Sequence, residues 1–199
     1  MPLKVIALPN PSSPNPALYG VGRDKFDKAT TDLPADWDWV AYSSPASLRE
    51  GLQKLIQKKH GCLDTLEIYA HGSEGDCNGL DLINLSQWAA ELNKLDWCDD
   101  SAIYLSGCTT GCIPLVGAST SIAQQLSTMI PGSQPRVATI FGSRGYISGS
   151  VAKDDVAVSQ TYVLTDANGV ASKLTPPRNS EDANGPFSWR AFQNGVQLP

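Results

Sequence analysis

The sequence is poor in the residues that metal sites usually require. Its 199 residues include only two histidines, His60 and His71, and five cysteines. It contains no C-x-x-C pair and no H-x-x-x-H motif, whereas structural zinc sites normally combine two such close pairs. We therefore expect no metal ion, and any chemistry that uses histidine must draw on one of these two side chains.

Basic residues are also scarce. The chain has 15 lysines and arginines against 20 acidic residues, which gives a formal net charge of −5, and its longest basic run is Lys58-Lys59. Binding to nucleic acid or to an anionic membrane surface depends on clustered lysine and arginine. No apolar stretch approaches the roughly 20 residues that cross a bilayer. We expect neither a nucleic acid nor a membrane as partner.

Export signals are missing as well. In the opening MPLKVIALPNPSSPNP, the apolar stretch extends only from Val5 to Leu8 before prolines follow, unlike a secretion signal. An odd number of cysteines in such a chain favours reduced thiols and a cytoplasmic location. One alternative stays open, a disulfide between Cys77 and Cys112 that would act as a redox gate.

Several common catalytic and phosphate-binding motifs do not occur. The sequence contains no G-x-S-x-G, no G-x-x-x-x-G-K-[ST] and no G-x-G-x-x-G. The nearest segment, Gly20-Val21-Gly22-Arg23, neither follows a strand nor begins a clear helix. We therefore expect no nucleotide or other organic cofactor.

Short apolar runs alternate with helical patterns up to residue 142, which is typical of an α/β fold with a mostly parallel sheet. This pattern predicts a three-layer α/β/α sandwich. The predicted strands are Leu3–Leu8, Trp39–Tyr42, Leu66–Ala70, Ala102–Leu105 and Val137–Phe141. The predicted helices run from a cap at Ser44 to Gly61, over about Leu85–Leu95, and over about Ser119–Ile130.

The pattern changes after residue 142. Thr161–Thr165 and Val170–Leu174 flank Asp166-Ala167-Asn168-Gly169, a turn sequence suited to a β-hairpin, and Phe187–Phe192 is a short last strand. We therefore predict one domain over residues 1–199, with a core at 1–142 and an accessory β-rich extension at 143–199.

Two predicted strands end in reactive residues. One leads into His71-Gly72-Ser73 and the other into Ser106-Gly107-Cys108-Thr109. Active sites of open α/β sheets lie at the carboxyl ends of the strands. If the two strands are neighbours, His71 and Cys108 come out side by side, and the imidazole can favour the nucleophilic thiolate. The N–H groups of Gly72 and Cys108 can then stabilise an oxyanion.

These two segments resemble the caspase-like cysteine peptidases, a group that includes caspases, legumains, clostripain, gingipains, separases and bacterial CHAT domains. The pattern L-S-G-C-T-T-G is most similar to the cysteine block of CHAT domains. The resemblance implies a caspase-like fold and a cysteine endopeptidase with Cys108 as nucleophile and His71 as acid/base. It also implies that Gly72 helps to form the oxyanion site and that the residue before the scissile bond sets specificity.

Two other functions remain open. A pseudopeptidase of the same fold would use the groove only to bind a regulatory protein partner. A latent peptidase would need cleavage or a ligand, with control in the Thr175–Pro186 loop or the Pro9–Trp37 connection.

The substrate preference is also open. Arg144 and Arg190 can each pair with a carboxylate, and Ser188-Trp189-Arg190 resembles the caspase segment that binds the substrate's aspartate. A nearby carboxylate would favour basic substrates instead, and the candidates are Glu74, Asp76 and Asp81. His60 follows Lys58-Lys59 at the end of a predicted helix, so we interpret it as structural.

Overall fold

A computed structural model describes most of the first 130 residues and parts of the remainder. The described ranges are 1–12, 30–31, 33–73, 76–77, 79–107, 110–111, 119–130, 138–143, 146–147, 158–159, 162–165, 171–174 and 189–199. Cys108, Cys112, Arg144 and the turn at residues 166–169 lie outside them.

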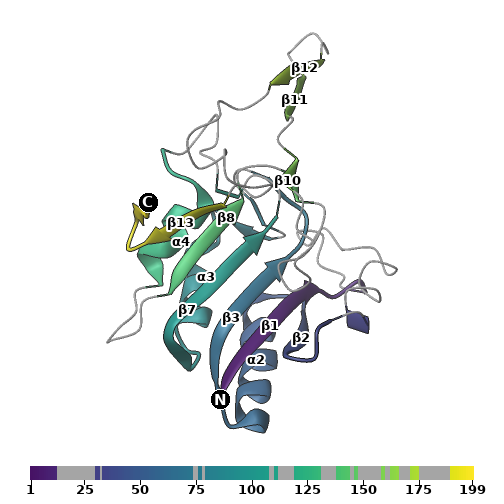
Figure 1. Cartoon of the computed structure of the whole chain (residues 1–199), viewed down its shortest axis with the longest axis vertical. Helices are drawn as coiled ribbons and strands as arrows, with labels where there is room; N and C mark the ends of the chain where they lie inside the picture. The colour runs from purple at the N-terminus through teal and green to yellow at the C-terminus, as the bar shows by residue number, and fades with distance from the viewer. Residues whose placement is uncertain are drawn as a thin grey trace.

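A seven-stranded, mostly parallel sheet forms the centre of the fold (Figure 1). Its strand order is β14-β13-β8-β7-β3-β1-β2, and the pairs from β2 across to β8 are parallel. The bounds are β1 Pro2–Pro9, β2 Trp37–Tyr42, β3 Cys62–Tyr69, β7 Trp97–Ser106, β8 Thr139–Ser143, β13 Trp189–Gln193 and β14 Val196–Gln197. The prediction of an α/β fold with a mostly parallel sheet is confirmed.

Three helices, α2 (Pro45–Lys59), α3 (Leu85–Leu92) and α4 (Ile122–Met129), pack side by side on one face of this sheet. The strands turn alternate side chains toward them, among them Val5, Ala7, Leu66, Ile68, Ile103, Leu105 and Ile140, and these form one core with the inner faces of the helices. The three-layer sandwich predicted from the sequence requires helices on both faces of the sheet. The described part of the chain supplies α2, α3 and α4 to one face only.

The start of α2 follows directly from its sequence. Ser44 is the N-cap, and its side chain accepts a hydrogen bond from the Ser47 amide while the Ser47 hydroxyl accepts one from the Ser44 amide. Pro45 fits the first helical position because its missing N–H would have no partner there. The helix ends at His60, which adopts a left-handed conformation with φ of 51°. Both predicted ends are therefore confirmed to within a residue or two.

The inward faces of the helices largely match the sequence pattern. Leu48, Leu52 and Ile56 of α2, and Leu85, Trp88 and Leu92 of α3, are buried. In α4, the apolar spacing predicts that Ile122, Leu126, Met129 and Ile130 face inward. Ile122, Leu126 and Ile130 are buried, but Met129, the last residue of the helix, is 36% exposed, so the prediction is wrong for Met129.

The sequence predicted a last strand at Phe187–Phe192 but did not indicate which strand it pairs with. This last strand corresponds to β13, which pairs antiparallel with β8 and so extends the central sheet. The predicted hairpin is confirmed as β11 (Tyr162–Thr165) paired antiparallel with β12 (Ala171–Leu174). Another small pair joins β9 (Tyr146–Ile147) to β10 (Val158–Ser159).

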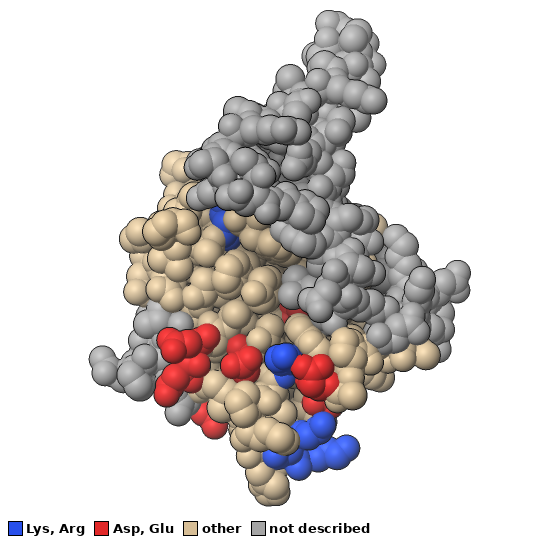
Figure 2. Space-filling view, in the orientation of Figure 1, with Lys and Arg blue, Asp and Glu red and all other residues tan. Residues whose placement is uncertain are grey.

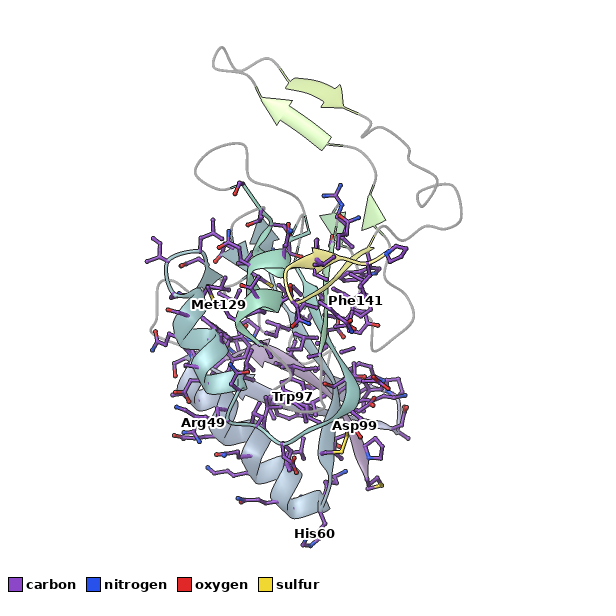
Figure 3. The ribbon with its side chains drawn as sticks, turned by 90° about the vertical axis from the view of Figure 1, so that its left-hand side faces the viewer. Arg49, His60, Trp97, Asp99, Met129 and Phe141 are labelled. Atoms are coloured by element: carbon purple, nitrogen blue, oxygen red, sulfur yellow. A yellow bond between two sulfur atoms is a disulfide. The ribbon has the colours of Figure 1, made fainter. Side chains whose placement is uncertain are left out.

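Cys62 and Cys98 form a disulfide with a Cα–Cα distance of 5.1 Å. It links β3 to β7 near their amino ends, beside Asp99 in Figure 3. The expectation of reduced thiols is therefore wrong for these two residues, and the cytoplasmic location loses the argument on which it was based. Cys77 carries a buried thiol, so the open alternative of a Cys77–Cys112 disulfide is not formed.

None of the helices in the described ranges has the length and apolar character of a membrane span.

Candidate active site

The two strands that end in the predicted reactive residues are neighbours. β3 pairs in parallel with β7, and the last pair in register is Tyr69 with Ser106. The Ala70 amide continues the pairing by donating to the Ser106 carbonyl at 3.3 Å. His71 and Cys108 each stand two residues beyond that last pair in the sequence. The neighbouring strands on which the dyad hypothesis depends are therefore present.

The histidine side of this edge is held by a small three-stranded sheet. Its strands are β4 (Gly72–Ser73), β5 (Asp76–Cys77) and β6 (Leu80–Asp81). Gly72 pairs with Cys77, whose buried Sγ donates to the Ile68 carbonyl of β3 at 3.8 Å. His71, the residue before this sheet, is exposed. The imidazole is thus carried at an accessible position between two anchored segments.

The two strand ends approach each other closely at glycines. A Cβ atom on Gly107 would lie 3.0 Å from the Gly72 Cα and 3.1 Å from the Cys77 Sγ. Both distances are shorter than ordinary carbon contacts, so a side chain at position 107 would push the two segments apart. Gly107 therefore lets the cysteine-bearing segment lie directly against the histidine-bearing one.

The segment that follows Cys108 is anchored through Thr110, which is fully buried. Its hydroxyl donates to the Leu105 carbonyl at 2.8 Å and accepts from the Ser143 amide at 3.0 Å. The next residue, Gly111, donates its amide to the Ser143 carbonyl at 2.7 Å. The chain on the far side of Cys108 is thus attached both to β7 and to the end of β8.

The amino end of α4 meets the same segment. The Ala123 amide, in the first turn of α4, donates to the Thr110 carbonyl at 3.3 Å, and Ser121 caps the helix through its side chain. The amino end of a helix carries a partial positive charge. That charge is directed at the carbonyl of Thr110, which follows Cys108 by two residues in the sequence.

Arg190 lies beside this segment, one strand further along the sheet. Its register partner is Gly142 of β8, and one guanidinium nitrogen donates to the Gly111 carbonyl at 3.2 Å. Its Nε is buried and has no hydrogen-bond partner among the described residues. Of the five residues named for substrate preference, Arg190 is the one whose side chain donates to Gly111, in the segment that follows Cys108.

The other four have different placements. The Asp81 carboxylate accepts the Ile83 and Asn84 amides at 2.8 Å and 2.9 Å, and Glu74 lies outside the described residues. The Asp76 carboxylate accepts the Gly79 amide at 3.0 Å and so belongs to the turn between β5 and β6. Arg144 lies outside the described residues. His60 lies at the lower end of the molecule in Figure 3, far from the carboxyl ends of the strands. That position agrees with its structural interpretation.

Aromatic side chains line the sheet face opposite α2, α3 and α4. Tyr104 stacks on Phe141 with ring centroids 4.5 Å apart and meets Trp189 edge-on at 5.5 Å. Burial raises the pKa of Tyr104, with further contributions from the negative charges of Glu67 and Asp64. This phenol therefore stays neutral at physiological pH, and the cluster fixes β13 beside β8.

Most of the charged surface of the described residues lies away from the carboxyl ends of the strands. On the face shown in Figure 2, acidic and basic side chains of the described residues gather around the amino ends of the strands, with both signs close together. Within the described ranges, no three histidine, cysteine, aspartate or glutamate side chains cluster closely enough to hold a metal ion.

Sequence reasoning missed Thr110, Gly111 and Ser143. The pattern S-G-C-T-T-G contained a signal for the first two, since a threonine and a glycine directly after a strand end often form a tight turn. Ser143 had no such signal because its contact depends on how β8 pairs with β7.

No protein-family model matches this chain, and comparisons with curated proteins and with solved structures find no similar protein.

Proposed function

We propose that this protein is a cysteine endopeptidase that hydrolyses peptide bonds with Cys108 as nucleophile and His71 as acid/base. One observation carries the proposal: β3 and β7 are paired neighbours in a register that ends at Tyr69 and Ser106, two residues before His71 and Cys108. We also propose that the fold is a caspase-like sandwich, because the His71 and Cys108 segments resemble those of the caspase-like peptidases.

The chemistry follows the usual course of a thiol peptidase. The Cys108 thiolate attacks the carbonyl carbon of the scissile bond, and the N–H groups of Gly72 and Cys108 stabilise the resulting oxyanion. His71 gives a proton to the leaving amine, which departs and leaves a thioester on Cys108. Water, deprotonated by His71, then hydrolyses the thioester and restores the thiol. No metal ion or organic cofactor takes part in these steps.

Two features near Cys108 support a reactive thiol. The positive end of α4 faces the Thr110 carbonyl, and such a charge lowers the pKa of a nearby thiol. His71 is exposed at the end of its strand, where a substrate can reach it.

The substrate is a peptide or protein, and its preferred side chain is part of the proposal. Arg190 is held at the Gly111 carbonyl beside the cysteine segment, whereas the Asp76 carboxylate already accepts a hydrogen bond in its own turn. This contrast favours an acidic residue before the scissile bond over a basic one.

The test is a cleavage profile over a peptide library, with mild reductant to keep Cys108 reduced. Wild-type protein is expected to cleave and to react once with a peptidyl electrophile, while Cys108→Ala does neither and His71→Ala is slowed by about 10²-fold or more. His60→Ala is the matched control and should behave as wild type.

Hydrolysis that persists in Cys108→Ala would overturn the proposal. Binding of a peptide without any turnover or covalent reaction would favour the non-catalytic interaction module instead.

A further inference from the structure

Thr110 occupies an unusual position for a side chain that takes no part in the proposed reaction steps. It is fully buried at the carboxyl edge of the sheet, two residues after Cys108. Its hydroxyl makes two good hydrogen bonds, one donated to Leu105 O and one accepted from the Ser143 N–H. A single oxygen thus joins the strand before Cys108 to the neighbouring strand β8.

The donated bond closes the chain on itself around Cys108. Leu105 lies three residues before the cysteine and Thr110 two residues after it. The hydrogen bond of 2.8 Å therefore joins the two ends of a very short loop. The hydroxyl also lies 3.4 Å from the Gly107 carbonyl oxygen. The Leu105 and Gly107 carbonyl oxygens therefore both face the buried hydroxyl.

We propose that Thr110 is a positioning residue whose hydroxyl sets the orientation of the Cys108 segment for catalysis. The inference rests on the proposed function and extends it to a residue that touches no substrate. Thr110 is held in turn on three sides, by the Ser143 amide, by the Ala123 amide on its carbonyl, and through Gly111 by Arg190. Loss of the hydroxyl removes the closure onto Leu105 and the bond from the Ser143 amide, and it leaves the contacts of the Thr110 and Gly111 carbonyls in place.

The test compares Thr110→Val, which keeps the shape without the hydroxyl, with Thr110→Ser, which keeps the hydroxyl. The first readout is the rate at which iodoacetamide alkylates Cys108 across a pH series, located by mass spectrometry of peptides. The second is kcat and KM for the best substrate of the library. Thr128→Val is the matched control because the exposed Thr128 hydroxyl donates to Gln125 O at 2.7 Å in α4, away from the cysteine segment.

Thr110→Val is expected to lower the alkylation rate and kcat by about tenfold or more, with KM little changed, since small misplacements of reacting groups have effects of this size. Thr110→Ser should stay within about twofold of wild type, as should Thr128→Val. If Thr110→Val does not fold, Thr110→Ala against Thr110→Ser makes the same comparison.

The two proposals fail in different ways. Wild-type alkylation rates in folded Thr110→Val or Thr110→Ala would overturn the positioning role, whatever the peptidase activity. A wild-type protein without turnover, but with alkylation that depends on the Thr110 hydroxyl, would keep the positioning role and overturn the endopeptidase.

Discussion

Gly111 and Gly142 pack backbone against backbone. A Cβ atom on Gly111 would lie 2.4 Å from the Gly142 carbonyl oxygen, and one on Gly142 would lie 2.7 Å from the Gly111 amide nitrogen. Neither obstacle is a side chain that can rotate away. The cysteine-bearing segment thus reaches the end of β8 only because both positions lack a side chain.

Gly111→Ala is therefore expected to lower the free energy of unfolding by about 1–3 kcal/mol, the usual cost of overpacking a buried site. Urea unfolding followed by circular dichroism measures it. The control is Gly51→Ala in α2, where the added Cβ would meet the Val40 side chain at an ordinary 3.5 Å. Because alanine favours a helix over glycine, this control should gain about 0.5–1 kcal/mol. A Gly111→Ala protein as stable as wild type would contradict the close packing.

The disulfide gives a second prediction. Replacing both Cys62 and Cys98 with serine should lower the free energy of unfolding by about 2–4 kcal/mol, because an unfolded chain without the link has more conformations. Reductant should destabilise the wild-type protein to a similar extent and leave the double variant unchanged. Wild-type stability that does not respond to reductant, with free thiols at both positions, would show that the bond is not formed.

The third prediction concerns pH. A hydrogen bond from Lys94, and then one from Arg49, lower the pKa of Glu91, whose contacts lie at 2.5 Å and 2.7 Å. A lowered pKa in the folded state means that the ionised carboxylate stabilises the fold above its unfolded pKa. This contribution is lost as pH falls through the folded pKa.

Glu91→Gln should therefore unfold at lower urea than wild type at pH 7, and the difference should shrink as the pH falls below 4.5, the ordinary pKa of a glutamate, and through the lowered pKa of Glu91. Glu50→Gln serves as the control, since Glu50 is more exposed and has one longer contact with Arg49, at 3.3 Å. A difference between wild type and Glu91→Gln that is independent of pH would rule out this ion-pair explanation.

The fourth prediction tests the start of α2. Ser44→Ala removes the side chain that accepts the Ser47 amide and should cost about 1 kcal/mol of stability. Ser86→Ala, at an exposed position in the first turn of α3, is the comparison and should change stability by less than about 0.5 kcal/mol. Equal stability of the two variants would argue against the cap.

The parts of the fold that sequence could predict are those with local signals. Ser44 and Pro45 mark a helix start within a single turn of chain, and the apolar spacing from Leu48 to Ile56 marks its buried face. The strand leading to His71 was likewise recognisable from its apolar run, although β3 begins four residues earlier, at Cys62. Local patterns are sufficient when neighbouring residues alone decide the structure.

The parts that sequence could not predict depend on pairing between distant segments. The Cys62–Cys98 disulfide requires the amino ends of β3 and β7 to be adjacent, and the register between them shifts at Leu63 to Thr65. The antiparallel pairing of Trp189 with Ser143 joins segments far apart in the chain. The spacing of residues along the sequence does not determine how distant strands pair or in which register.

The candidate site likewise has residues that the sequence could predict and contacts that it could not. His71 and Cys108 could be named because each follows an apolar strand. The contacts of Thr110 and Arg190 could not be named, since they depend on β8 lying next to β7 and on β13 lying next to β8.

The Cys62–Cys98 bond also determines what a break in the chain would do. It closes a covalent ring that contains β3, the His71 segment, α3 and the start of β7. A single cut anywhere between Cys62 and Cys98 would leave both fragments joined, with β3 still tied to β7. On a denaturing gel, a protein cut inside this ring would therefore separate into two fragments only after reduction. Without reduction, the cut protein would keep its two strands together as one molecule.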